Sequence, residues 1–309
     1  MNYEYYKIFY YVGKHKNITR AATELYSSQP AVSRAIRNLE EELGCVLFQR
    51  SKHGVEFTHE GQILFNYVSS GCSQFMRGEE EINKAIDPES GTIHIGTTIT
   101  SMYGFLFEVI RLFRRSHPKT RFIISTGSSN KTMEKVRNGL VDIAFVTTPF
   151  IPSRSLAQSR VLDFSDILIC GNGEPYKKLL DRTVRLDELS DYPFVCLEEG
   201  MQFRQHIDDF FEENELRFSP EIELDSADQI VPFVKKNYGL AFVPEDIAKE
   251  AIDLGEVRKI TPEKTPAPRS VYMITNPTHP VMGASREFSR IIQRKILPVE
   301  KNTDNREKN

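Results

Sequence analysis

Two short helical patterns joined by a tight turn near the N-terminus constrain this chain more than any other part of its sequence. Asn17 can cap the first helix, whose small residues Ala21 and Ala22 let a neighbouring helix approach closely. After a brief turn, Ser28 can cap the second helix, and Pro30 lies in its first turn, where a missing N–H costs nothing. This spacing predicts a helix-turn-helix.

The second of these helices has two different faces. Its apolar residues recur at intervals of four, three and four and are predicted to face the core: Val32, Ile36, Leu39 and Leu43. Its opposite side is polar in the N-terminal half: Gln29, Ser33, Arg34 and Arg37. Since a recognition helix contacts base edges through that half, these side chains are candidates to bind DNA. For an isolated helix, a solvated face without a ligand would be the simpler explanation.

The segment that follows this helix favours DNA binding. The apolar runs VLFQR and VEFT are joined by Ser-Lys-His-Gly, which predicts a hairpin with a basic tip. Arg50, Lys52 and His53 are placed to reach phosphates or the minor groove. With an amphipathic helix predicted at residues 3–15, residues 1–58 are expected to form a winged helix-turn-helix, which is mainly α-helical.

The run AATELYSSQPAVSRAIRNLEEELGCVLFQRSKHGVEFTHEG resembles the signature of LysR-type transcriptional regulators. It matches their Ala-Ala, Ser-Gln-Pro-Ala-Val-Ser, Ile-x-x-Leu-Glu, Leu-Gly, Leu-Phe-x-Arg and Thr-x-x-Gly elements in order and register. The resemblance implies a regulator that binds double-stranded promoter DNA, with Ser28, Gln29 and Pro30 at the DNA beside the residues named above. As architecture rather than signature, it extends to about residue 298.

Residues 59–87 read as one long helix with a heptad seam. The apolar seam positions are Phe65, Val68, Cys72, Phe75, Ile82 and Ile86, and Glu79 is the polar exception. The seam could pack on its own domain. The resemblance implies instead antiparallel pairing with the linker helix of a second subunit, giving a homodimer and then a dimer of dimers. A dimer would set two recognition helices on the half-sites of a roughly palindromic promoter site.

Residues 88–300 alternate strands and helices, which predicts parallel sheets covered by helices. We expect two α/β subdomains linked by crossing strands, one formed by residues 91–162 and 269–298 and the other by 163–268. This arrangement resembles periplasmic binding proteins and the effector domains of LysR-type regulators. The polar tail 301–309 is expected to be disordered.

Ligands of open α/β sheets bind at the carboxyl ends of strands, near the N-termini of helices. The candidates for such a site are Thr98, Thr100, Ser101, Ser128, Thr147, Thr148, Phe203, Arg204 and Ser226. Hydroxyls beside helix N–H groups suit a polar or anionic small molecule. Each serine or threonine alone could equally be an ordinary helix cap. Their convergence predicts an effector site.

Composition and motifs exclude several other classes. No apolar stretch reaches the roughly 18 residues of a membrane span, and no secretory signal opens the chain, so we expect a cytoplasmic protein without membrane contact. Net charge is −3, so the positive charge for DNA must be concentrated locally. No nucleophile, phosphate-loop or metal-ligand motif is present, which predicts no enzyme activity, catalytic residue, cofactor or metal.

Some alternatives remain open at this point. The cysteines Cys45, Cys72, Cys170 and Cys196 are scattered, which fits reduced thiols, although a redox pair of Cys170 and Cys196 is not ruled out by their spacing. A cytoplasmic binding protein or enzyme with an accessory DNA-binding domain is the second functional hypothesis. RNA polymerase is a further candidate partner. The sequence specifies neither the effector, nor the operator, nor activation against repression.

Overall fold

The computed structural model describes residues 2–51, 54–86, 91–279, 281 and 283–295. The chain divides into two compact units. The N-terminal unit comprises residues 1–88 with 138–140, and the C-terminal unit comprises the remainder. Among the described residues, no helix combines the length and the apolarity that crossing a membrane requires.

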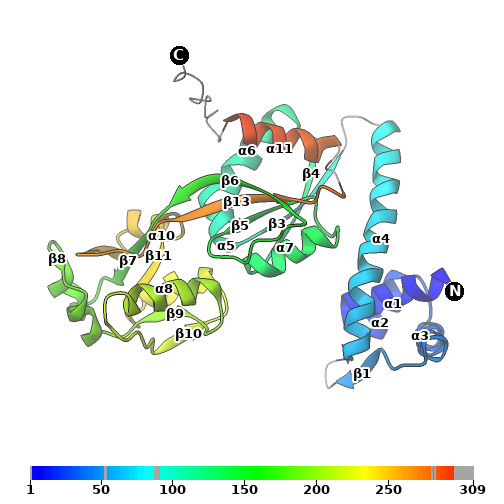
Figure 1. Cartoon of the computed structure of the whole chain (residues 1–309), viewed down its shortest axis with the longest axis horizontal. Helices are drawn as coiled ribbons and strands as arrows, with labels where there is room; N and C mark the ends of the chain where they lie inside the picture. Colours follow the sequence, from blue (N-terminus) through cyan, green and yellow to red (C-terminus); the bar gives the residue numbers. More distant parts are fainter. Residues whose placement is uncertain (1, 52–53, 87–90, 280, 282, 296–309) are drawn as a thin grey trace, which may run out of the picture. The chain divides into compact units, whose positions relative to one another are not determined.

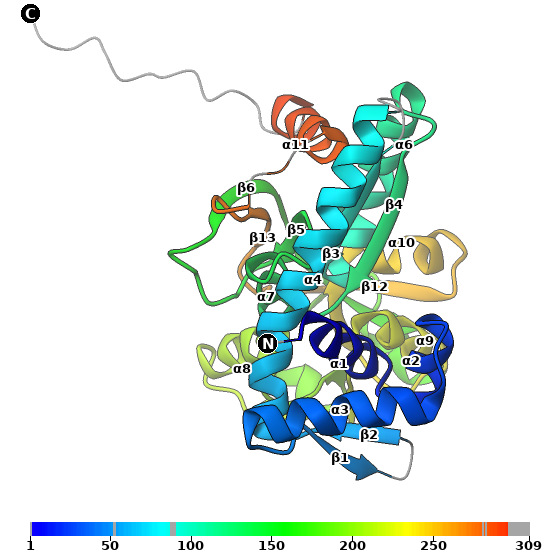
Figure 2. The same ribbon diagram turned by 90° about the vertical axis from the view of Figure 1, so that its right-hand side faces the viewer.

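The N-terminal unit begins with three helices, followed by an antiparallel hairpin and one long helix (Figures 1 and 2). In chain order these are α1 (Tyr3–His15), α2 (Ile18–Glu24), α3 (Gln29–Leu43), β1 (Phe48–Ser51), β2 (Gly54–Phe57) and α4 (His59–Ile86). The predicted caps are confirmed: Asn17 Oδ1 accepts from the Arg20 N–H at 3.0 Å, and Ser28 Oγ from the Ala31 N–H at 3.4 Å. The predicted winged helix-turn-helix is therefore present.

One core holds the three helices and the hairpin together. It is built on fully buried residues from each helix, among them Phe9, Ala21, Val32 and Leu39. The apolar spacing of α3 predicts Leu43 in this core as well, but Leu43 is 40% exposed. The reason is that α3 ends there, and Gly44, whose φ of +70° suits glycine, turns the chain. Leu47, after this turn, fills the core instead.

The Thr-x-x-Gly element fastens the start of α4 to the hairpin. Thr58 Oγ1 donates to the Val46 carbonyl at 2.7 Å and accepts from the Gly61 N–H at 2.9 Å. A Cβ at Gly61 would lie 2.0 Å from the carbonyl oxygen of Leu47, so only glycine allows the helix to pass this close. This motif is thus explained by helix capping and by backbone packing.

The first part of the C-terminal unit is a five-stranded sheet in the order β4-β3-β5-β13-β6. Its strands are β3 (Thr92–Thr97), β4 (Arg121–Thr126), β5 (Ile143–Thr147), β6 (Ala157–Phe164) and β13 (Arg269–Thr275). Its helices are α5 (Ile99–Ser101), η1 (Met102–Leu106), α6 (Phe107–Ser116), α7 (Ser129–Arg137) and α11 (Gly283–Lys295). The first three strands are parallel, as expected, whereas β13 is antiparallel to β5 and β6.

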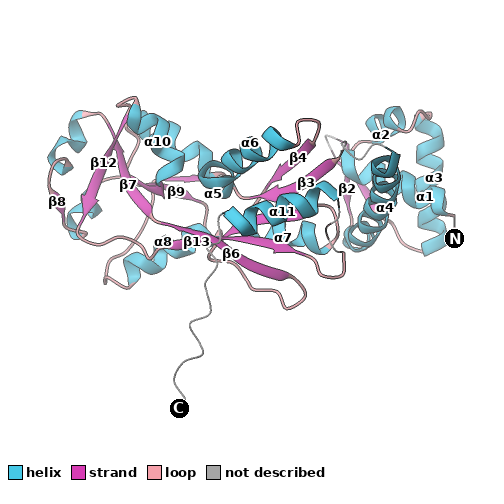
Figure 3. Cartoon of the chain, turned by 90° about the horizontal axis from the view of Figure 1, so that it is seen from above, coloured by secondary structure: helices cyan, strands magenta, loops and turns pink. Residues whose placement is uncertain are grey.

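In the five-stranded sheet, the antiparallel strands are those that connect the two parts of this unit. Figures 1 and 3 show β6 and β13 leading from the five-stranded sheet towards β7 (Asp166–Gly171). One strand carries the chain out and the other returns it, so the pair must run in opposite directions. The prediction of parallel sheets is therefore wrong for β13 and β6, and in the second part β7 is also antiparallel to the strands on both of its sides.

The second part contains a four-stranded sheet, β11-β7-β12-β8, and a parallel pair, β10-β9. Its other strands are β8 (Thr183–Val184), β9 (Val195–Leu197), β10 (Ile222–Leu224), β11 (Ala241–Pro244) and β12 (Val257–Pro262). Its helices are η2 (Glu174–Leu179), η3 (Asp187–Asp191), α8 (Gln202–Glu212), η4 (Ala227–Gln229), α9 (Ile230–Lys235) and α10 (Glu245–Asp253). Two apolar clusters, built around Phe211 and Val234, fill this part.

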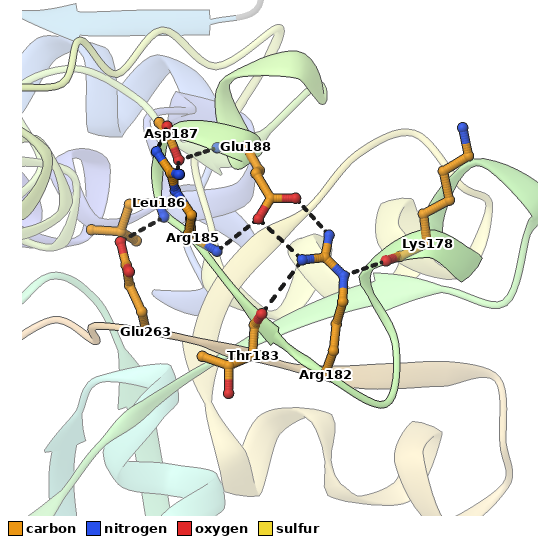
Figure 4. Close-up of polar contacts among 8 residues, drawn as sticks. All are labelled: Lys178, Arg182, Thr183, Arg185, Leu186, Asp187, Glu188 and Glu263. Atoms are coloured by element: carbon orange, nitrogen blue, oxygen red, sulfur yellow. Dashed lines mark hydrogen bonds and ion pairs between the residues drawn. The ribbon is translucent and has the colours of Figure 1, made fainter.

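An exposed polar network fixes the loops around β8 and η3 (Figure 4). Both terminal nitrogens of Arg182 donate to the Glu188 carboxylate, at 3.0 and 2.6 Å, and the Arg185 N–H donates to the same group at 3.1 Å. These bonds lower the pKa of Glu188 to about 2. Sequence periodicity gives no sign of this network.

Candidate functional site

The predicted DNA-facing side of α3 is exposed and polar. Arg34 and Arg37 are exposed, and within the described part of the chain neither forms an ion pair. Gln29 Nε2 donates to Ser33 Oγ at 2.9 Å, which holds these two side chains together on the same face. Ser28 and Pro30 are also exposed, at the N-terminus of the helix. This surface can offer cationic and amide donors to a nucleic acid.

The hairpin beside this helix is the predicted wing. Arg50 is exposed on β1, whereas Lys52 and His53 lie outside the described residues. Glu40, near the far end of α3, accepts from the N–H groups of Leu47 and Phe48 at 2.7 and 3.3 Å. Its carboxylate therefore anchors the start of the wing, a role that the sequence pattern does not reveal.

The predicted seam of α4 divides into two sets in the structure. Phe65 and Val68 pack against the core of the N-terminal unit, with the Phe65 ring 4.7 Å from that of Phe57. Phe75 and Ile82 are instead 70% and 64% exposed. Cys72 is half-buried between the two sets. Ile86 ends the helix, and its side chain is outside the described residues.

A different row of residues forms the free apolar surface of α4. This exposed stripe recurs every three or four positions and comprises Ile63, Tyr67, Gly71, Phe75, Gly78 and Ile82. Nothing lies within 4 Å of a Cβ built at Gly71 or Gly78. The two glycines thus leave the helix surface low enough for a second helix to approach closely. The stripe overlaps the predicted seam at Phe75 and Ile82.

The C-terminal unit contains a cavity of about 350 Å³ where the strand ends of its two parts meet. Seven of the predicted effector residues line it: Thr98, Thr100, Ser128, Thr147, Thr148, Phe203 and Ser226. Ser101 and Arg204 do not. The lining residues that the sequence pattern does not reveal include Lys131 and Arg269.

The hydroxyl groups around the cavity differ in how far the protein itself uses them. Thr98 Oγ1 lies 2.9 Å from Ser101 Oγ and accepts from the Ser101 N–H, so Thr98 acts as a helix cap and Ser101 is its partner. Thr148 Oγ1 accepts from the Ser270 N–H at 2.9 Å. The Thr100 hydroxyl has no hydrogen-bond partner among the residues that the structure describes. The Thr100 hydroxyl is therefore available to a ligand, as are those of Thr126 and Thr147, which likewise have no hydrogen-bond partner among the described residues.

Arg204, predicted for the site, has a structural role. It is buried, and its guanidinium donates to Asp208 at 2.9 Å and to Glu223 at 2.6 Å. These bonds tie α8 to β10. Because successive residues on a helix point about 100° apart, Phe203 can line the cavity while Arg204 faces away from it.

Arg269 is the buried cation of the cavity. Its Nε and Nη2 donate to the two carboxylate oxygens of Asp166 at 2.7 and 2.6 Å, and Nη1 donates to the Thr148 carbonyl at 3.4 Å. The rings of Phe164 and Phe203 lie 4.7 and 4.6 Å from the guanidinium carbon. Asp166 lies 103 residues away in the sequence, so no local motif could have revealed the pair.

The electrostatics of the cavity suit a polar or anionic ligand. Lys131 reaches it from α7 and forms no ion pair within the described part of the chain. The N-terminus of α8 also faces it, and no side chain of the described residues caps that end, so its first N–H groups are available. Asp225, which is exposed, is the acidic residue among the described lining residues. The charge of Arg269 is already balanced by its ion pair with Asp166.

The buried cysteines show no sign of a redox site. Cys170 and Cys196 are free thiols, and burial raises their pKa to about 11 and about 12 respectively. A thiol must ionise to react as a nucleophile, so these two groups are held in their unreactive form. Among the described residues, no group of three or more histidine, cysteine, aspartate or glutamate side chains is arranged to hold a metal.

Two family models match the chain. Residues 4–62 match the bacterial regulatory helix-turn-helix protein, lysR family, and residues 87–296 match the LysR substrate binding domain. A probable RuBisCO transcriptional regulator from Guillardia theta is 29% identical over 290 residues, which make up 91% of this chain and 92% of that protein.

Solved structures show the same fold at low sequence identity. Full-length CbnR in complex with its target DNA aligns with a TM-score of 0.71 and 17% identity, over 95% of this chain and 99% of that one. The effector-binding domain of QuiR, in complex with shikimate, aligns with a TM-score of 0.58 and 17% identity, over 67% of this chain and 97% of that one. Together with the family matches, the DNA-binding fold and the cavity show that this chain is a LysR-family transcriptional regulator, with an N-terminal helix-turn-helix and a C-terminal effector-binding domain.

Proposed function

We propose that the cavity between the two parts of the C-terminal unit binds a small polar or anionic effector, which modulates promoter binding or activation. The observation that carries this proposal is the convergence of Thr98, Thr100, Thr148 and Phe203 on one cavity. They come from strand ends and helix N-termini far apart in the sequence, where ligands of open α/β sheets are bound. The structure of the QuiR effector-binding domain in complex with shikimate supports a small-molecule effector.

The effector proposal is tested on the full chain. A panel of small organic acids, sugar phosphates and neutral metabolites would be screened for a rise in melting temperature, since a ligand that binds only the folded state stabilises it. A ligand found this way should bind Thr100→Val more weakly than wild type. If no compound stabilises the protein, or if a ligand binds Thr100→Val equally well, the assignment of this cavity is wrong.

We propose that α3 reads bases and that the wing contacts the DNA backbone. Arg34 can pair with a guanine edge and Gln29 with an adenine edge, and both are exposed at the N-terminal half of the helix. Arg37 and Arg50 provide further positive charge on the same unit. Gel shifts with DNA from the protein's own upstream region, against random DNA of equal length, would test this. Equal affinity for both would contradict base reading.

We propose that the exposed stripe of α4 forms the dimer contact and that two dimers associate further. We also propose that RNA polymerase is a partner of the DNA-bound protein at the promoter. The glycines and exposed apolar side chains of the stripe support the dimer contact.

Since DNA is the proposed partner, the protein is expected to act in the cytoplasm. We propose a regulator without enzyme activity, because among the described residues no histidine or cysteine lines the cavity. NMR of an identified ligand, incubated with the protein, should show no conversion.

A further inference from the structure

A buried histidine lies directly behind the Asp166–Arg269 pair. His206 follows Phe203 by three residues on α8, so the two side chains share one face of the helix. Phe203 covers the Arg269 guanidinium, while His206 Nε2 lies 4.0 Å from Asp166 Oδ2. That nitrogen is buried and has no hydrogen-bond partner among the described residues. One helix thus places an aromatic ring and an imidazole against the same ion pair.

The guanidinium of Arg269 retains donors for a ligand. Arginine has five N–H groups, and the bonds to Asp166 and Thr148 use three of them. The other two have no acceptor among the described residues, and Arg269 lines the cavity. Guanidinium N–H groups bind carboxylate, sulfate and phosphate oxygens well. Arg269 can therefore contact an oxyanion without giving up Asp166.

Charge balance links this contact to His206. Without a bound anion, Asp166 and Arg269 neutralise each other, so a proton on His206 would leave the buried cluster with a net positive charge. The other groups that face the ring are the main chain of Ala267 and the carboxylate of Asp209, one turn along α8. Burial and the charge of Arg269 both lower the pKa of His206, and the ring is therefore neutral near pH 7.

We propose that an oxyanion bound at Arg269 is accompanied by protonation of His206, so that the regulator binds its anionic effector more tightly as the pH falls. This inference rests on the proposed effector site. The anion offsets the charge of Arg269 and leaves Asp166 in excess, which favours a positive imidazole beside it. The protonated Nε2 can then donate to Asp166 and satisfy a buried nitrogen that otherwise lacks a partner within the described part of the chain.

Sulfate is a suitable probe because its charge does not change over the range from about pH 5.5 to about pH 7.5, in which a histidine can titrate. The experiment uses the full chain, with the methyl NMR signals of Ile230 and Val243, which line the cavity, as the readout of occupancy. In wild type, sulfate should bind more tightly at the lower pH, by up to about tenfold for each pH unit over which one proton is taken up. In His206→Gln, the affinity should be the same at both pH values.

His117→Gln is the matched control, because His117 stacks on Phe113 at the end of α6 and does not line the cavity. This variant should keep the pH dependence of wild type. A wild-type affinity that does not vary with pH, or a pH dependence that persists in His206→Gln, would overturn the inference. Sulfate that fails to shift the cavity methyls would also overturn it. In each of these cases, a metabolite that stabilises wild type but binds Thr100→Val weakly would still support the proposed function.

Discussion

Phe75 provides the sharpest test of how two chains associate. Its side chain is 70% exposed, so most of its apolar surface is still available to a partner. Full burial of a phenylalanine contributes about 1.5–3 kcal/mol, and a symmetric dimer buries two copies. Scaling by the exposed fraction gives about 2–4 kcal/mol for both. We therefore expect Phe75→Ala to weaken the dimer about 30- to 1000-fold.

Sedimentation equilibrium over a range of protein concentrations measures this change directly. The melting temperature of the dissociated protein should be almost unchanged, because Phe75 contributes little to the core of its own chain. Phe65→Ala is the matched control on the same helix. Its ring packs against Phe57 and Phe9, so this variant should instead destabilise the N-terminal unit.

The opposite pattern would refute the assignment of the stripe. If Phe75→Ala keeps the dissociation constant of wild type, the exposed stripe of α4 is not the dimer contact. If Phe65→Ala weakens the dimer without lowering the melting temperature, the partner contacts the seam read from the heptads.

Three further predictions concern DNA, the effector and acid stability. Arg34→Ala should cost about 1–3 kcal/mol on the promoter site and much less on random DNA, whereas Arg50→Ala should weaken both alike; equal losses in gel shifts would show that α3 does not read bases. Thr100→Val should lower effector affinity by about 1–3 kcal/mol in calorimetry while leaving DNA binding without effector unchanged, since the hydroxyl has no partner within the described structure. The pKa of Glu188 is lowered in the folded state from 4.5 to about 2, so its contribution to stability is present above pH 4.5 and is lost as the pH falls towards 2. Glu188→Gln should therefore lower the melting temperature near neutral pH and progressively less below pH 4.5, and a difference that does not depend on pH would contradict this account.

The DNA-binding unit could be predicted almost completely, because its signals are local. Caps at Asn17 and Ser28 and the apolar spacing of α3 each depend on neighbours a few residues away. The prediction for Leu43 is wrong because periodicity does not report where the core ends. On α4, apolar residues recur every three or four positions both where the helix packs on its own unit and where it presents a free apolar surface. This spacing therefore could not distinguish Phe65, which packs on the core of its own chain, from Phe75, which is exposed.

The effector site could be predicted in outline but not in its charges. Strand ends are visible in the sequence, and therefore Thr98, Thr100 and Thr148 can be found. Whether an arginine faces the cavity or an ion pair depends on side chains distant in the sequence. Arg204 follows a strand end closely, which makes it a candidate, yet Asp208 and Glu223 hold it. No local sequence signal marks Arg269, and only the folded structure shows that it lines the cavity.

The arrangement of β6 and β13 determines which part of the C-terminal unit can fold first during synthesis. In the five-stranded sheet, β6 pairs with β13, and β13 also pairs with β5. Since β13 begins at residue 269, a nascent chain that has emerged only as far as β12 leaves the edges of both β5 and β6 unpaired. The second part of the unit lies wholly between these strands, so it can fold on the ribosome while the first sheet is still incomplete. If translation pauses after β12 has emerged, the nascent chain therefore has a folded second part and an incomplete first sheet. The unpaired edges of β5 and β6 are then accessible to chaperones or to incorrect pairing.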